Sequence, residues 1–222
     1  MQFDFDAMSP AARFAFLTGA VVPRPIALLT TLTPDGVCNA APYTFFGIAG
    51  TEPPIVTVTV LPAPGGRMKD TGVNILHTRE FVVNLVSEEL AEAMNVTCID
   101  APPGVDELQI AGLETAASVK IKTPRIARSP VALECVLHSS VPLSANQVLF
   151  IGRVTHAHIP DALVINAQEP LLDTAAMHLV GGMHGVKWYT RTRDLFTMDR
   201  PSWNAWVQEG KVLPVDGADT PS

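Results

Sequence analysis

The sequence predicts an all-β fold, an antiparallel barrel accompanied by short helices. Short runs of apolar and β-branched residues are separated by Gly, Pro, Asn and Asp, the residues typical of tight turns. The helical patterns are brief, and they do not alternate with strands in the way that a parallel βαβ sheet requires. The 222-residue chain has no internal repeat and no low-complexity linker, so we expect one domain.

Three parts are expected along the chain. Residues 1–20 form an N-terminal leader segment, residues 21–200 form the barrel domain, and residues 201–222 form a C-terminal tail that frays. Within the leader, Ser9 is placed to cap a short helix whose first residue is Pro10.

The first half of the domain is expected to contain three strands. Residues 26–33 form the first strand, and the turn Pro34-Asp35-Gly36 follows it, with Gly36 free to adopt a positive φ. Residues 37–41 form the second strand and lead into a loop around Tyr43 and Thr44. Residues 54–60 are the clearest strand, because β-branched side chains dominate the run.

The second half is predicted to mix short helices with strands. Asp70 is expected to cap a helix over residues 71–78, and Ser87 with two glutamates signals a helix that runs to Met94. Residues 96–112 are expected to be irregular because Pro and Gly interrupt them. The remaining strands are expected at residues 81–86, 131–138 and 148–159.

Composition narrows the class of protein. Hydrophobic residues make up 47% of the chain and charged residues 17%, which excludes disorder and suggests that a partner subunit covers some apolar surface. The net charge of −7 argues against a nucleic-acid ligand. No apolar run approaches the roughly 20 residues that cross a bilayer, and the N-terminus has no export signal pattern, so we expect a soluble, cytoplasmic protein.

The loop from Gly65 to Thr71 is the best candidate for a phosphate site. Its glycines allow the backbone to approach an anion, two cations (Arg67 and Lys69) and a hydroxyl follow, and the N–H groups of the next helix point at the same place. Without further context the same residues also fit an ordinary turn, in which Asp70 caps the helix and the cations are solvated.

A second group of polar residues could hold an aromatic ring system. Asn39, Pro42, Tyr43 and Thr44 supply an amide, hydroxyls and loop N–H groups around apolar surface, although an ordinary turn would use the same residue types. Thr57 and Thr59 fall on one face of their strand. The sequence leaves two interpretations of these side chains, as ligand contacts or as half-buried barrel positions.

An ordered set of motifs resembles the flavin reductase-like family, the FMN-binding split barrels that include the flavoredoxins. The resemblance extends over about residues 20–200. Its main motifs are residues 22–31 with Arg24 and Thr31, Asp35-Gly36, residues 39–44 with Ala41, Glu52-Pro53-Pro54, Lys69-Asp70-Thr71 with Asn74, residues 81–86, Asp106-Glu107, Gly152-Arg153-Val154 and Tyr189.

The resemblance implies a Greek-key split β-barrel that binds FMN as a homodimer. It implies that Lys69 and Thr71 hold the FMN phosphate, and that hydride passes from NAD(P)H to flavin N5. Electrons would then leave to free flavin or to another acceptor such as a monooxygenase. The cofactor performs this chemistry, so no residue is predicted to be a catalytic acid or base. The cofactor-binding candidates are Arg24, Thr31, Asn39, Ala41, Pro42, Tyr43, Thr44, Thr57, Thr59, Arg67, Lys69, Asp70, Thr71, Asn74 and His158.

Two other functions are compatible with the sequence. A non-catalytic flavin- or haem-binding module could use the same barrel. His156 and His158 lie two residues apart on one strand face and could begin a metal site of the cupin kind, but no liganding carboxylate is evident from spacing and we expect no metal. The chain has neither a Gly-x-Ser-x-Gly motif nor a Gly-x-Gly-x-x-Gly motif, so nothing supports a hydrolase triad or a Rossmann site.

Overall fold

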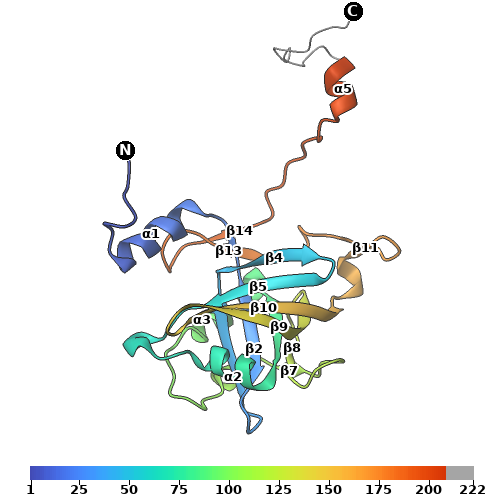
Figure 1. Cartoon of the computed structure of the whole chain (residues 1–222). Helices are drawn as coiled ribbons and strands as arrows, with labels where there is room; N and C mark the ends of the chain where they lie inside the picture. Colours follow the sequence, from blue (N-terminus) through green and yellow to red (C-terminus); the bar gives the residue numbers. More distant parts are fainter. Residues whose placement is uncertain (209–222) are drawn as a thin grey trace, which may run out of the picture.

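The computed structural model describes residues 1–208 and shows an antiparallel split β-barrel (Figure 1). Seven strands form its main sheet in the order β3-β2-β6-β9-β10-β5-β4, and every neighbouring pair is antiparallel. These strands are β2 (Ala27–Leu32), β3 (Cys38–Tyr43), β4 (Phe46–Thr51), β5 (Pro54–Val60), β6 (Glu80–Leu85), β9 (Ala132–Ser144) and β10 (Gln147–His158).

The sheet is curled so that its two edges meet. Strands β3 and β4 lie at opposite edges, yet only Thr44 and Phe45 separate them in the chain. Three Cα–Cα steps of about 3.8 Å span at most roughly 11 Å, so the edges must converge at this point. Within the described residues no strand pairing joins β3 to β4, which leaves the barrel split along this side.

Alternation of side chains fills the barrel. On β5, Val56, Val58 and Val60 point into the core, whereas Thr57 and Thr59 lie on the outer face and are half-buried. Because the Thr side chains occupy the opposite side of the pleat, the predicted period of two is confirmed. A second apolar cluster packs on the other side of β2, which is therefore buried on both faces.

The helices are short, as predicted. Ser9 caps α1 (Pro10–Ala20), and its Oγ accepts a hydrogen bond from Ala12 N at 3.2 Å. The prediction for α2 (Asp70–Thr78) was wrong by one residue, because Lys69 occupies the cap position and Asp70 is already helical. The other helical segments are η1 (Pro64–Gly66), η2 (Glu88–Leu90), α3 (Ala91–Val96), α4 (Glu107–Ile110), η3 (Asp161–Leu163) and α5 (Trp203–Gln208).

Several elements were not predicted. Strand β4 occupies residues between the second and third predicted strands, and α4 lies within the segment expected to be irregular. Strand β9 is longer than expected, β10 has the expected length, and the two form one hairpin. The small pairings are β1 (Arg24–Pro25) with β13 (Val180–Gly182) and β14 (Tyr189–Arg191), β7 (Thr115–Ala116) with β8 (Arg125–Ile126), and β11 (Val164–Asn166) with β12 (Leu171–Leu172).

The first and last described residues lie on one side of the barrel (Figure 1). Helix α1 covers the end near β13 and β14, and an extended segment carries α5 away from the body (Figure 1). The predicted C-terminal tail contains the helical residues 203–208, its fraying stays a prediction, and residues 209–222 lie outside the described residues. No helix of the described chain is long and apolar enough to span a membrane.

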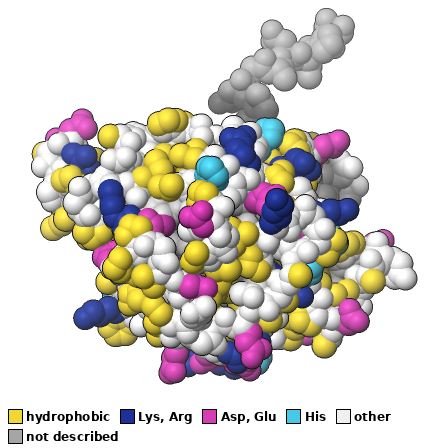
Figure 2. Space-filling model, turned by 90° about the horizontal axis from the view of Figure 1, so that it is seen from below, with side chains coloured by type: hydrophobic (Ala, Val, Ile, Leu, Met, Phe, Trp, Pro, Cys, Tyr) yellow, Lys and Arg dark blue, Asp and Glu magenta, His cyan; other side chains and the backbone are white. Residues whose placement is uncertain are grey.

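The face seen from below carries charges of both signs among hydrophobic side chains (Figure 2). Lys and Arg side chains are interspersed with Asp and Glu there. Recognition of a nucleic-acid backbone uses a continuous basic surface, and this face does not provide one.

Candidate functional site

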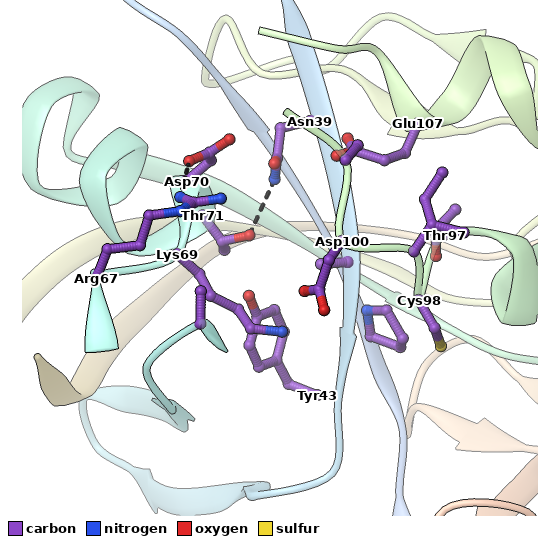
Figure 3. Close-up of a pocket in the computed structure, with 15 residues that line it drawn as sticks. Asn39, Tyr43, Arg67, Lys69, Asp70, Thr71, Thr97, Cys98, Asp100 and Glu107 are labelled. Carbon is purple, nitrogen blue, oxygen red and sulfur yellow. Dashed lines mark hydrogen bonds and ion pairs between the residues drawn. The ribbon is translucent and has the colours of Figure 1, made fainter. Parts of the chain in front are cut away.

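A polar pocket of about 140 Å³ lies where β3, the start of α2 and the loop after α3 meet (Figure 3). Arg67, Lys69, Asp70 and Thr71 come from the α2 side, while Thr97, Cys98, Asp100 and Glu107 form the opposite wall. Eight of the predicted residues line it: Asn39, Ala41, Pro42, Tyr43, Arg67, Lys69, Asp70 and Thr71. The sequence candidates for the phosphate and for the ring therefore meet in space.

A buried hydrogen-bond network fixes the floor of the polar pocket. Asn39 Nδ2 donates to Thr71 Oγ1 at 2.9 Å and to Thr31 Oγ1 at 3.1 Å. Asn74 Nδ2 donates to the same Thr31 oxygen at 3.1 Å. Because Thr71 accepts from Asn39, its own hydroxyl proton is left to donate, either to a ligand or to the nearby Tyr43 oxygen. Thr31 and Asn74 thus support the pocket from behind without lining it.

Tyr43 supplies an unsatisfied hydroxyl. Its side chain is buried, and its Oη has no hydrogen-bond partner among the described residues. Burial raises the pKa of this phenol, with the nearby Thr71 hydroxyl opposing the shift only in part, so Tyr43 is a neutral donor. A buried polar atom without a partner costs roughly 1–3 kcal/mol, which favours a ligand that satisfies it.

The charges in the polar pocket are unevenly paired. Arg67 Nη1 forms an ion pair with Asp70 Oδ1 at 2.8 Å, so these two charges offset each other. Lys69 is half-buried and has no ion-pair partner among residues 1–208. Lys69 and Asp100 extend into the same space from opposite sides (Figure 3). An anionic ligand would therefore meet an available ammonium group and one exposed carboxylate.

Glu107 is a pocket residue that the sequence did not single out. Asp106 caps α4 by accepting from Leu108 N at 2.9 Å, and this cap sets Glu107 against β3. Its Oε2 accepts from Ala40 N at 3.0 Å. Burial raises the pKa of the Glu107 carboxyl, so its negative charge is suppressed relative to an exposed glutamate. The Asp106-Glu107 pair in the motif set was the available signal.

Two further cavities adjoin the polar pocket. An aromatic pocket of about 170 Å³ is walled by Phe14, Trp188 and Tyr189, and it shares Pro42 and Cys98 with the polar pocket. A bridging pocket of about 260 Å³ shares Pro42 with both cavities. Small-molecule sites commonly measure about 300–1,000 Å³. Each cavity alone is too small, but the three together reach that range.

Three of the predicted residues line the adjoining cavities and not the polar pocket: Arg24 borders the aromatic pocket, Thr44 borders both the aromatic and the bridging pocket, and Thr59 borders the bridging pocket. The walls contributed by Phe14 and Trp188 were missed. Phe14 lies in the segment that we expected to be only a leader, and Trp188 comes from a loop about 145 residues beyond Pro42. Local sequence patterns do not show such long-range neighbours.

Arg24 is committed to the protein itself. Its guanidinium donates to the carbonyl oxygens of Thr18 and Met183, the latter at 2.6 Å, and to Thr44 Oγ1 at 3.3 Å. Burial lowers the pKa of Arg24. The side chain borders the aromatic pocket, but its contacts join α1 to the link between β3 and β4, which carries Thr44, and to Met183 directly after β13. The structure therefore places Arg24 as a support of the site.

Thr57 and His158 do not reach these cavities. Thr57 Oγ1 donates to Gly47 O at 3.4 Å on the outer face of the sheet. His158 lies four strand positions from Pro42, through Ala132, Asn84 and Leu28. At about 4.8 Å per strand, that separation is roughly 19 Å along the sheet.

His158 instead belongs to a buried polar cluster. Its Nε2 lies 2.6 Å from Glu134 Oε1, and the ring of His156 packs edge-on at a centroid distance of 5.0 Å. The fully buried Glu134 also accepts from the backbone N–H groups of Val119 and Lys120. Among residues 1–208, no group of three His, Cys, Asp or Glu side chains is arranged to hold a metal ion.

The residues present fit a phosphate-bearing aromatic ligand such as a flavin mononucleotide. Lys69, Thr71 and the N–H groups at the start of α2 suit the phosphate. The unpartnered Tyr43 hydroxyl and the adjoining aromatic pocket suit a polar-edged ring. The bridging pocket is lined by both Lys69 and Phe14, so it brings the cation and an aromatic wall to one space.

Comparison with known proteins agrees with this geometry. The model of the flavin reductase like domain matches residues 19–176. An uncharacterized protein of Deinococcus radiodurans is 38% identical over 211 residues, covering 93% of this chain and 92% of that protein.

Two solved structures share the fold. Nitrilotriacetate monooxygenase component B from Bacillus cereus superposes with a TM-score of 0.83 at 29% identity, covering 89% of this chain and 98% of that one. The 2-nitrobenzoate 2-nitroreductase of Pseudomonas fluorescens superposes with a TM-score of 0.84 at 29% identity, covering 98% and 100%. The resemblance identified from the motifs is thereby confirmed, and the chain belongs to the flavin reductase-like domain family.

Proposed function

We propose that this protein binds FMN and acts as an NAD(P)H-dependent flavin oxidoreductase. The observation that carries the proposal is a group of three neighbouring cavities that share lining residues: Lys69 lines the polar and bridging pockets, and Phe14 lines the bridging and aromatic pockets. Family membership supports a flavin as the ligand and oxidoreduction as the activity.

The protein's part is to bind and orient the cofactor. Lys69 and Thr71 hold the phosphate, Tyr43 donates its hydroxyl to the ligand, and Asn39 keeps Thr71 in a donating orientation. When bound, FMN supplies the acceptor for a nicotinamide hydride at its N5 atom. No side chain is assigned a proton-transfer role, in keeping with chemistry that belongs to the cofactor.

The electron acceptor and the assembly are part of the proposal. A monooxygenase component among the structural neighbours supports a flavin or a partner oxygenase as acceptor. Large exposed apolar side chains support a homodimer, as does the low charge content. We place the protein in the cytoplasm, where reduced nicotinamide nucleotides are available.

An anaerobic spectral titration tests the proposal. The purified protein should bind FMN with absorption bands near ~450 nm and ~375 nm, and NADH or NADPH should bleach them. Absence of FMN binding at micromolar protein would contradict the central claim. Bleaching by dithionite but by neither nucleotide would favour the alternative of a non-catalytic flavin-binding module.

A further inference from the structure

The chain carries an apolar C-terminal segment in which the side chains of Phe196, Met198 and Trp203 are largely exposed. Arg191 and Arg193 both pair with Glu88, which fixes the base of this segment to the body. Beyond them, residues 194–208, here called the C-terminal arm, run away from the barrel and end in α5 (Figure 1).

The composition of the C-terminal arm does not suit solvent. Phe196 is 83% exposed and Trp203 is 69% exposed, and Leu195 and Met198 are also exposed. An isolated helix as short as α5 is not stable in water, because nucleation costs more than a few hydrogen bonds return. Such a segment is stabilised by packing against another surface.

The barrel has an apolar groove of the required kind. A cavity of about 480 Å³ lies between β4, β5 and β13, and its lining is almost entirely apolar. Ile48 stands at its rim with 82% of its surface exposed, and Thr192 lines it just before the arm departs. None of the groove's lining residues comes from the C-terminal arm of the same chain.

We propose that the C-terminal arm of one copy seats in the apolar groove of a second copy, and the reverse. The arm begins two residues after Thr192, which lines the groove, so a two-fold axis passing close to this point would bring each arm beside the partner's groove in a self-complementary contact. The two aromatic side chains of one arm bury roughly 300–500 Å². Two arms with their groove walls therefore reach the ~1,200–2,000 Å² of a stable interface.

This exchange would couple assembly to the candidate site. Arg24 and Ile26 line both the apolar groove and the aromatic pocket. An arm seated in the groove therefore supports the back of the aromatic pocket. The proposal itself depends on the arm and the groove alone and does not require that the bound cofactor be FMN.

Two full-length variants at exposed positions test the exchange. The arm variant combines Phe196→Ser with Trp203→Ser, and the groove variant is Ile48→Arg. Each is expected to raise the dimer dissociation constant at least tenfold in analytical ultracentrifugation, because aromatic anchors and central apolar contacts dominate such interfaces. Ile165→Arg, at 62% exposure on β11, is the matched control and should dimerise like the wild type.

Mixing the two variants separates exchange from the other arrangements. The groove variant has an intact arm and the arm variant an intact groove, so an equimolar mixture should form hybrid dimers that neither variant forms alone. Native mass spectrometry distinguishes the hybrids by mass. Three outcomes would overturn the proposal: a monomeric wild type, variants that dimerise normally, and weakened variants that do not complement each other. The third outcome would mean that the arm packs on its own chain or elsewhere.

FMN binding by the same variants keeps the two proposals apart. Dimers that exchange arms but bind no FMN would leave this inference standing and remove the proposed function. Monomeric protein that binds FMN would remove this inference and leave FMN binding, the central claim of the proposed function, standing.

Discussion

At the scale of single residues, the proposed recognition of a ligand phosphate depends on the position of Lys69. Lys69 precedes α2 and faces the polar pocket with no ion-pair partner in the described chain, whereas the neighbouring Arg67 is paired with Asp70. A ligand phosphate therefore gains a charge-assisted hydrogen bond from Lys69 without breaking an existing one. Asp100 on the opposite wall would repel the same phosphate.

Lys69→Ala is expected to weaken FMN binding and to spare riboflavin. A charge-assisted hydrogen bond contributes roughly 1.5–3 kcal/mol, which corresponds to an approximately 10- to 150-fold loss of FMN affinity. Riboflavin has no phosphate, so its affinity should change less than about threefold. Calorimetric titration of both ligands measures the difference.

Asp100→Asn is the matched control for Lys69→Ala. Removing this carboxylate should strengthen FMN binding and leave riboflavin unchanged, the opposite sign to Lys69→Ala. Equal losses for both ligands on Lys69→Ala would place the lysine at the ring or in the fold. No loss for either would return residues 65–71 to a solvated turn.

Glu134 is the buried carboxylate with a clear consequence for pH. Burial alone raises the pKa of this carboxyl, but hydrogen bonds from His158 and from the N–H groups of Val119 and Lys120 outweigh it and hold the pKa below its usual value. A lowered pKa in the folded state stabilises the protein above the unfolded value near ~4.3. That stability is lost as pH falls through the folded pKa.

Glu134→Gln should therefore reduce stability at neutral pH more than in acid. We expect a loss of about 2–3 kcal/mol at pH 7, since the amide cannot replace a carboxylate that accepts from three donors. The gap between the two proteins should shrink below about pH 4. Urea unfolding across pH measures it, with the exposed Glu169→Gln as control. A gap independent of pH would show that the ionised carboxylate is not what stabilises this cluster.

At the scale of elements, the packing of β10 on β6 depends on one glycine. A Cβ built on Gly152 would lie 2.3 Å from Phe81 Cζ, and Phe81 is fully buried in the core. The Phe81 ring therefore occupies the space that a side chain at position 152 would need. The closeness of these two strand neighbours of β9 explains why a glycine stands in the middle of a long strand.

Gly152→Ala is expected to destabilise the fold by about 1–3 kcal/mol, through overpacking against Phe81. Chemical denaturation of the variant measures this cost. In a double-mutant cycle, Phe81→Leu should recover at least about 1 kcal/mol of it, because the smaller side chain vacates the contact. Additive effects of the two changes would mean that the glycine is needed for another reason.

The elements that could be predicted are those with a local signal. The alternation of β5, the turn at Gly36 and the cap at Ser9 are each encoded within a few residues, and each is confirmed. Strand β4 was missed because its sequence, rich in Gly and Ala, has a weak strand pattern, and its pairing with β5 compensates. The short strands β13 and β14 likewise depend on partners distant in sequence.

At the scale of the whole molecule, the site is a product of topology. The motif set located the polar residues of β3 and α2, and the fold brought them together as predicted. The aromatic pocket was invisible in the sequence, because it combines the leader helix with the loop after β13. The role of His158 could not be predicted for a different reason. Its place at the end of a strand is compatible with a position at the rim of the barrel, and only the sheet register shows that this part of the rim is distant from the cavities.

The two-residue link between β3 and β4 makes the two ends of the split in the barrel different, because the edges are joined at one end only. Thr44 and Phe45 join the two edge strands covalently, so the edges cannot separate at that end. Any separation of β3 from β4 must begin at the opposite end of the two strands. Thr44 itself borders the aromatic and bridging pockets, so the link between β3 and β4 is also a wall of the candidate site. A ligand bound there would contact the end of the seam at which the chain joins the two sheet edges.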